Sequence, residues 1–406
     1  MHLLVAVGML AALTTLSEGV AGAAPPVLAN GGALAVPGGA GNFGHAVAIS
    51  GTTAMVGAPG TSGGRGTVYV YVEPKGGPWP AAPSATLLDP ANTIGDGFGI
   101  SVALSGGYAI VGAEGTGTLA GAAYIYRRTG SVWSTTPAAT LSYPSPVSGD
   151  QFGISVALSG TTAIVGAGTY GSAGAAFVYQ RTGTTWALKA TLTDAAANPH
   201  WGFGQPVAIS GTTAVVSAYG ADTGSCGTPP CGAVDVYVRP MAGWVTTTSP
   251  TARLSDPAGL QNDYFGNAVA MAGGNVIVGD DNAYPPGAGP AYIFVRPGSG
   301  WASTATPTVT LPDPAPATND SFGLAVAITG STALVGAYTS PVASAGDVYV
   351  YRKVGGTWPA VPTTVKNPWP VPAAAGYFGL ALAVSGSTAV VGAPAGGGDS
   401  YIFRRV

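Results

Sequence analysis

A set of polar and aromatic residues interrupts an otherwise apolar, glycine-rich sequence at equivalent places. Seven stretches end in Val-Gly-Ala or a close variant, and the next residue varies among them: Pro59, Glu114, Gly168, Tyr219, Asp281, Tyr338 and Pro394. Asp280 replaces the usual alanine, and Ser217 replaces the usual glycine. Further reactive or aromatic side chains stand in nearby loops: Tyr170, His200, Trp201, Asp222 and Tyr284. Exposed rings stack on apolar ligand faces, so the set predicts a glycan or peptide site. Tolerated loop variation is the competing interpretation.

Catalytic chemistry has little support in the sequence. Glutamate occurs only at positions 18, 73 and 114, and histidine only at 2, 45 and 200. There is no His-Glu-x-x-His motif, and no Gly-x-Ser-x-Gly stretch is expected between a strand and a helix. Glu114 with Asp280 or Asp281 could form a carboxylate pair of the glycosidase type, which sequence spacing cannot test. We expect a non-catalytic protein without cofactor or metal, and keep a polysaccharide-active enzyme as an alternative.

The strands and loops that carry these residues belong to a unit that occurs seven times in the sequence. A Phe-Gly pair recurs, 51 to 62 residues apart, at Phe43, Phe98, Phe152, Phe203, Phe265, Phe322 and Phe378. A period of this size indicates a repeat architecture. Each pair opens a short apolar strand, which turns and returns as a second strand ending in Val-Gly-Ala. Glycine supplies the positive φ of a tight hairpin. We expect the same turn at Gly51, Gly106, Gly160, Gly211, Gly273, Gly330 and Gly386.

Two more strands complete each unit, at residues 121–126 and 139–141 in the second copy. The two inner strands carry no charged residue, so both faces of each sheet are expected to be covered. The prediction is an all-β, seven-bladed β-propeller with four antiparallel strands per blade. The last unit lacks its fourth strand, and an N-terminal strand around residues 33–37 is expected to complete it and close the ring. Six tryptophans share one repeat position and are predicted to be packing anchors: Trp79, Trp133, Trp186, Trp244, Trp301 and Trp358.

Acids also recur two residues before the phenylalanine, at Asp96, Asp150, Asp263 and Asp320. A residue that is repeated in several blades more often serves each blade than a single ligand. We predict that these carboxylates accept backbone N–H groups in the turn between blades.

The net charge, the composition and the N-terminal segment limit the possible partners and the cellular compartment. A net charge of −3, with 8% charged residues, argues against nucleic acid binding. Residues 1–23 resemble a signal peptide, with an apolar stretch and a small-residue cleavage site, although the first residues carry no positive charge. No other apolar run is long enough for a membrane helix. We expect a secreted protein, extracellular or periplasmic and monomeric, with residues 24–406 as one propeller. Cys226 and Cys231 would form a disulfide in such a compartment.

The repeated Phe-Gly and Val-Gly-Ala-Pro pairs resemble the FG-GAP repeat. The first and last copies show it best, with Phe43-Gly44 before Val56-Gly57-Ala58-Pro59 and Phe378-Gly379 before Val391-Gly392-Ala393-Pro394. That repeat builds the seven-bladed propeller of integrin α chains and secreted bacterial relatives. The resemblance covers residues 33–406 and implies extracellular adhesion or ligand binding rather than catalysis.

One departure from the integrin pattern removes an expected metal. Integrin-type calcium loops fill the turn between the first two strands with carboxylates, whereas this chain has Ser50-Gly51-Thr52-Thr53 and similar turns. Calcium needs six to eight oxygen ligands, so no calcium site is carried over. The turns between the first and second strands of all blades are expected on one face of the propeller, which we name the short-turn rim. The opposite face, with the loops between strands two and three and the links between blades, is the variable rim. We expect binding of a surface glycan or extracellular protein there, with a structural assembly role as the alternative.

Overall fold

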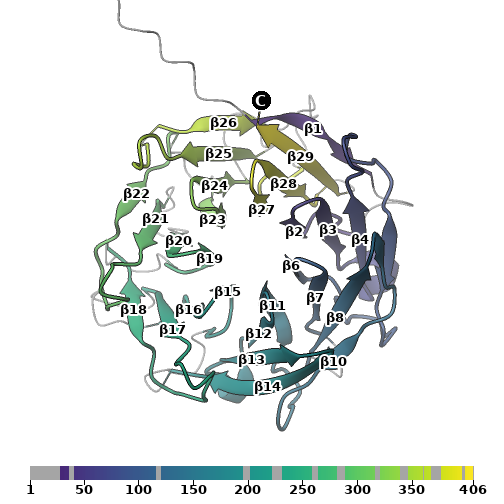
Figure 1. The fold of residues 1–406 in the computed structure, drawn as a ribbon, viewed down its shortest axis with the longest axis horizontal. Helices are drawn as coiled ribbons and strands as arrows, with labels where there is room; N and C mark the ends of the chain where they lie inside the picture. The colour runs from purple at the N-terminus through teal and green to yellow at the C-terminus, as the bar shows by residue number, and fades with distance from the viewer. Residues whose placement is uncertain are drawn as a thin grey trace, which may run out of the picture.

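The computed structural model shows seven antiparallel sheets arranged around a central axis (Figure 1). It describes residues 28–35, 41–115, 120–194, 202–221, 231–257, 264–280, 289–315, 321–338, 346–359, 361–366, 376–395 and 398–405. The predicted seven-bladed propeller is confirmed. We number the blades one to seven in the order of their Phe-Gly pairs.

Each blade runs outward from the axis in chain order. Blade one contains β2 (Ala46–Ser50), β3 (Thr53–Ala58), β4 (Thr67–Val72) and β5 (Ala85–Leu88). Blade two contains β6 (Ser101–Ser105), β7 (Tyr108–Ala113), β8 (Ala122–Thr129) and β10 (Ala139–Leu141), with the short β9 (Val132–Trp133) paired to β8. Blade three contains β11 (Phe152–Ser159), β12 (Thr162–Ala167), β13 (Ala175–Thr182) and β14 (Thr185–Leu192).

Blades four to six repeat this order. Blade four contains β15 (Val207–Ser210), β16 (Thr213–Ala218), β17 (Ala233–Val238) and β18 (Ala252–Ser255). Blade five contains β19 (Ala268–Ala272), β20 (Asn275–Gly279), β21 (Ala291–Val295) and β22 (Val309–Leu311). Blade six contains β23 (Phe322–Ile328), β24 (Thr332–Ala337), β25 (Asp347–Arg352) and β26 (Thr363–Lys366). The turn α1 (Thr61–Gly64) follows β3, and its Ser62 and Gly63 have left-handed dihedral angles, so it is a loop turn.

Blade seven joins the two ends of the chain. Its strands are β27 (Ala381–Ser385), β28 (Thr388–Ala393) and β29 (Asp399–Arg405), and β1 (Leu28–Leu34) adds the fourth. β1 runs antiparallel to β29, with Leu28 opposite Arg405 and Leu34 opposite Ser400. The strand lies earlier than the expected residues 33–37, but the predicted closure of the ring is confirmed. Arg404 also forms an ion pair with Glu73 of blade one.

Close backbone contact between blades explains the repeated glycines. The Phe-Gly glycines have φ values from 91° to 99°, a left-handed region that favours glycine. The carbonyl of each such glycine lies against the Val-Gly-Ala glycine of the preceding blade, so a Cβ atom at Gly57 would collide with the carbonyl of Gly99. Blade four has Ser217 instead, and its buried hydroxyl donates to the carbonyl of Gly266 at 2.6 Å. Ser217 therefore stabilises the contact between blades four and five and is not a ligand-binding residue.

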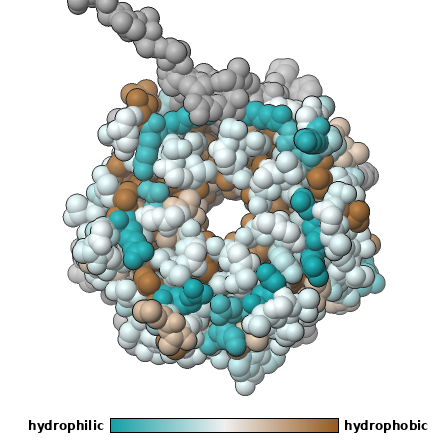
Figure 2. Space-filling model, in the orientation of Figure 1, coloured by the Kyte–Doolittle hydropathy of each residue, from teal (hydrophilic) through white to brown (hydrophobic). Residues whose placement is uncertain are grey.

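Apolar side chains fill the space between the blades. Phe98 is fully buried, and its ring meets Tyr124 and Tyr126 of its own blade at centroid distances of 5.8 and 6.2 Å. The six repeated tryptophans are all buried, as predicted. Figure 2 shows an opening along the axis, and its wall is built from apolar residues of the innermost strands, such as Ala157, Ala208 and Ala327.

A ring of serine hydrogen bonds links the turns of the short-turn rim. The hydroxyl of Ser105 in blade two accepts the N–H of Gly160 in blade three at 2.9 Å. The same bond joins four other pairs of neighbouring blades, from Gly106 to Ser50, Gly211 to Ser159, Gly273 to Ser210 and Gly51 to Ser385. The glycines in these turns have φ values from 57° to 61°.

Blade six departs from the predicted turn. Gly330 does not have the positive φ of the other six turn glycines, and the strands β23 and β24 pair only as far as Ile328 and Ala333. The hydroxyl of Thr329 instead accepts the N–H of Thr332 at 2.9 Å, inside its own turn. The N–H of Thr329 still donates to the carbonyl of Thr332 at 2.7 Å. The expectation of seven equivalent turns was therefore wrong at this blade, because the threonine hydroxyl accepts the N–H of Thr332 in place of the backbone carbonyl.

Candidate functional site

The backbone at each blade junction projects one residue onto the variable rim. This pre-phenylalanine position, directly before each Phe-Gly pair, has φ between 52° and 64° in all seven blades. Its occupants are Asn42, Gly97, Gln151, Gly202, Tyr264, Ser321 and Tyr377. Glycine and asparagine tolerate a left-handed backbone, whereas a large side chain there is strained by about 1–3 kcal/mol. Two tyrosines therefore stand at a position that disfavours them.

Both tyrosines meet a tyrosine of the preceding blade. Tyr264 lies 6.3 Å from Tyr219, between the ring centroids, at the junction of blades four and five. Tyr377 lies 5.3 Å from Tyr338 at the junction of blades six and seven, with the rings at 89°. All four rings are partly exposed, Tyr377 by 40%. Tyr219 and Tyr338 were among the predicted ligand residues. Tyr264 and Tyr377 were missed, although alignment of the repeats places all seven pre-phenylalanine residues in one column.

Of two other predicted site residues, Tyr170 is half-buried and Asp280 is buried. Tyr170 lies in the 3₁₀ turn η1 (Tyr170–Ser172), and its ring packs edge-on against Phe177 at 5.2 Å and against Tyr143 at 5.9 Å. Asp280 directly follows β20 and is 1% exposed. The structure places Tyr170 in an aromatic cluster of blades two and three, away from both tyrosine pairs.

Glu114 follows β7 and is half-buried. Desolvation raises the pKa of its carboxyl, and among the described residues its buried Oε2 atom has no hydrogen-bond partner. β7 and β20 lie on opposite sides of the axial opening (Figure 1), so Glu114 and Asp280 come from opposite sides of the ring.

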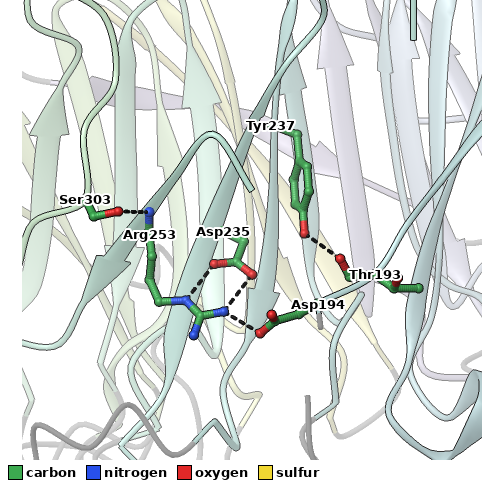
Figure 3. Close-up of polar contacts among 6 residues, drawn as sticks. All are labelled: Thr193, Asp194, Asp235, Tyr237, Arg253 and Ser303. Atoms are coloured by element: carbon green, nitrogen blue, oxygen red, sulfur yellow. Dashed lines mark hydrogen bonds and ion pairs between the residues drawn. The ribbon is translucent and has the colours of Figure 1, made fainter. Parts of the chain in front are cut away.

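A buried ionic network that was not predicted from the sequence joins blades three and four (Figure 3). The guanidinium of Arg253 on β18 donates to Asp235 on β17, from Nε to Oδ1 at 2.8 Å and from Nη2 to Oδ2 at 2.9 Å. Nη2 also forms an ion pair with Asp194, which follows β14 of blade three. Tyr237 donates to the carbonyl of Thr193 at 3.0 Å, beside the network. These contacts tie the end of one blade to the next.

Two network residues, Asp235 and Arg253, both differ from the residues that the other blades have at the same positions. The position of Asp235 is aromatic in every other blade: Tyr69, Tyr124, Phe177, Tyr292, Tyr349 and Tyr401. In five of those blades the residue opposite on the fourth strand is threonine, whereas here it is Arg253. Burial raises the pKa of the Asp235 carboxyl and Arg253 opposes that rise, while the hydrogen bond to Asp235 raises the pKa of Arg253.

A family model for the FG-GAP repeat matches six segments of the chain, residues 38–71, 85–126, 139–179, 186–237, 248–294 and 309–351. Together they cover more than half of the sequence. The chain belongs to the FG-GAP repeat family. No curated protein sequence matches this FG-GAP propeller. The family assignment and the propeller geometry agree, and the seventh repeat, at Phe378, extends the family pattern to the blade that closes the ring.

Several predicted residues of this FG-GAP propeller lie outside the described part of the structure. They are the signal peptide at residues 1–23, His200, Trp201, Asp222, Asp281, Tyr284, Cys226 and two of the acids before the phenylalanines, Asp263 and Asp320. Cys231 is fully buried, and its expected disulfide with Cys226 stays a prediction. The predicted structural role of the acids before the phenylalanines is confirmed at Asp150, which accepts the N–H of Val147 at 2.8 Å and the hydroxyl of Tyr143 at 2.9 Å.

Two kinds of feature are absent from the described residues. Within the ranges given above, no group of three or more histidine, cysteine, aspartate or glutamate side chains is placed to hold a metal ion. No helix in that part of the FG-GAP propeller is long and apolar enough to cross a membrane.

Proposed function

We propose that this FG-GAP propeller is a secreted, monomeric, non-catalytic binding protein that holds a surface glycan or an extracellular protein on its variable rim. The observation that carries the proposal is the pair of tyrosine contacts at the junctions of blades four and five and of blades six and seven. Tyrosine presents a large, rigid contact area with a polar hydroxyl, and it is enriched in binding hot spots.

The strained backbone supports a binding role over incidental packing. Gly97 and Gly202 show that a glycine suits the pre-phenylalanine position, with φ values of 64° and 62°. Tyr264 and Tyr377 adopt the same conformation at a cost in stability. Unfavourable backbone conformations persist where a side chain must be held in a particular place, and ligand sites are common among such places.

The experiment changes both tyrosines to glycine, the residue that blades two and four have at this position. The chain would be tested against an array of glycans and matrix proteins, in calcium and in EDTA, beside the double variant Tyr264→Gly/Tyr377→Gly. We expect a ligand that binds the wild type in both buffers and is lost in the variant, while the melting temperature stays close to that of the wild type. Gln151→Gly is the matched control at the same backbone position, and it should keep full binding.

Other outcomes would redirect the proposal. Equal binding by the tyrosine variant would rule out the tyrosine pairs as the site. Binding abolished by EDTA in a folded protein would require a metal site. Binding to no glycan or protein would favour the assembly role, and capture of a partner from the producing cell would then be the next step. Cleavage of a bound polysaccharide would favour the enzyme alternative.

A further inference from the structure

The serine ring of the short-turn rim is interrupted at two adjacent places, around blade six. Ala272 stands where the other blades have serine or threonine, so it offers no hydroxyl to the turn of blade six. Thr329 uses its hydroxyl inside its own turn, accepting the N–H groups of Thr332 and Ser331 at 2.9 and 3.3 Å. Among the described residues, the N–H groups of Gly330 and Gly386 consequently lack the serine partner that the other five turns provide.

A cleft of about 350 Å³ lies at this interruption, between the turns of blades six and seven. Its wall includes Thr329, Gly330, Ser331, Arg352, Gly386 and Ser387. Ser331 and Ser387 are exposed, and Arg352 at the end of β25 is half-buried. Arg352 is the one charged side chain among the described residues that line the cleft. The cleft volume is near the lower limit for small-molecule sites, roughly 300–1,000 Å³.

We propose that this cleft binds a carboxylated sugar, such as a hexuronic acid unit of a glycan. A guanidinium and backbone N–H groups are donors that match a carboxylate, and serine and threonine hydroxyls both donate to and accept from sugar hydroxyls. Gly330, Gly386 and Arg352 all line this cleft beside the hydroxyl-bearing residues Ser331 and Ser387, so donors for a carboxylate and for sugar hydroxyls are combined in it. This site is on the rim opposite the tyrosine pairs and does not depend on the function proposed for them.

The test is calorimetric titration of the full chain with the methyl glycoside of glucuronic acid at neutral pH. The methyl glycoside of glucose is the neutral control, and acetate tests whether any carboxylate suffices. Arg352→Gln should weaken glucuronide binding by at least about tenfold, because a charge-assisted hydrogen bond is lost. Ser387→Tyr should abolish binding by filling the cleft from an exposed turn position.

Equivalent positions in intact parts of the ring give matched controls. Arg127→Gln in blade two and Thr161→Tyr in blade three change the same repeat positions as Arg352→Gln and Ser387→Tyr. Both controls, and Tyr264→Gly/Tyr377→Gly, should bind the glucuronide like the wild type. The proposal is overturned if the wild type does not bind the glucuronide, if the glucoside or acetate binds equally well, or if Ser387→Tyr binds unchanged. If Arg352→Gln does not fold, Ser387→Tyr still decides the outcome.

Discussion

The junction that enters blade two and the junction that enters blade four fill the same space with different chemistry. In blade two, Phe98 packs against Tyr124, and Thr140 stands opposite Tyr124 on the next strand. In blade four, Phe203 keeps one aromatic neighbour, Tyr237 at 6.4 Å, while Asp235 and Arg253 replace the tyrosine and the threonine. The fold therefore requires this position to be filled and its polar atoms to be paired, but it does not require an aromatic ring.

The difference also shows how the charged residues of blade four are stabilised. Asp235 is fully buried, and three hydrogen bonds or ion pairs from Arg253 satisfy it and Asp194. A buried ion pair is about neutral in stability compared with apolar residues of similar volume, but the loss of one partner is costly. The replacement of both residues together is therefore tolerated, and the replacement of either one alone is not.

The largest expected effect comes from breaking the ionic junction. Arg253→Met would leave two buried carboxylates without their guanidinium, and we expect the free energy of unfolding to fall by about 3–5 kcal/mol. Urea unfolding measures this directly. The matched change in the aromatic junction, Thr140→Met, alters an exposed residue and should cost far less. Equal losses in the two variants would show that the network is not what stabilises blade four.

A smaller effect is expected when the ionic junction is converted to the aromatic one. In Asp235→Tyr/Arg253→Thr, stability should stay within about 1 kcal/mol of the wild type or rise by up to about 4 kcal/mol. Asp89 shows that the acid equivalent to Asp194 needs no guanidinium, because it accepts the N–H groups of Ala91 and Thr93.

The two single variants provide the control for this conversion. Asp235→Tyr and Arg253→Thr should each be less stable than the double variant, which gives a large coupling energy in a double-mutant cycle. Additive losses would contradict the view that the two residues were exchanged as a pair.

The smallest effect is expected at Glu114. In contrast to Asp235, its carboxylate has a buried Oε2 with no hydrogen-bond partner among the described residues. Burial raises the Glu114 pKa above its ordinary value of 4.5, so the folded state binds a proton more tightly than the unfolded state. That contribution to stability is fully present below pH 4.5 and is lost as the pH rises through the raised pKa. Glu114→Gln should therefore gain stability relative to the wild type between pH 4 and pH 7. A constant difference in melting temperature across this range would refute the assignment.

Much of the fold could be predicted from the sequence because each blade repeats the same packing problem. The Phe-Gly pair recurs at all seven junctions and a buried tryptophan in six of the seven blades, so a single interpretation applied seven times identified the propeller and its closure. The exceptions were harder to predict. Asp235 and Arg253 differ from their equivalents when the repeats are aligned. That the two residues lie opposite each other follows only from the cross-strand register of β17 and β18. Tyr264 and Tyr377 are unusual because their backbone is left-handed. The altered turn at Gly330 depends on the hydrogen bond that the Thr329 hydroxyl accepts from Thr332. Such features are set by local geometry.

The strand that closes the ring also determines when folding can finish. Blades one to six each form from a continuous stretch of chain, but β1 must wait for β29, and Leu28 pairs with Arg405 at the other end of the sequence. Contacts between distant segments form slowly because the intervening chain must first be ordered. During synthesis, six blades can assemble while the first strand remains unpaired and blade seven lacks its outer edge. Completion of the propeller is thus a late event that requires both β1 and β29. A variant that lacks either strand would keep an open sheet edge able to pair with another molecule.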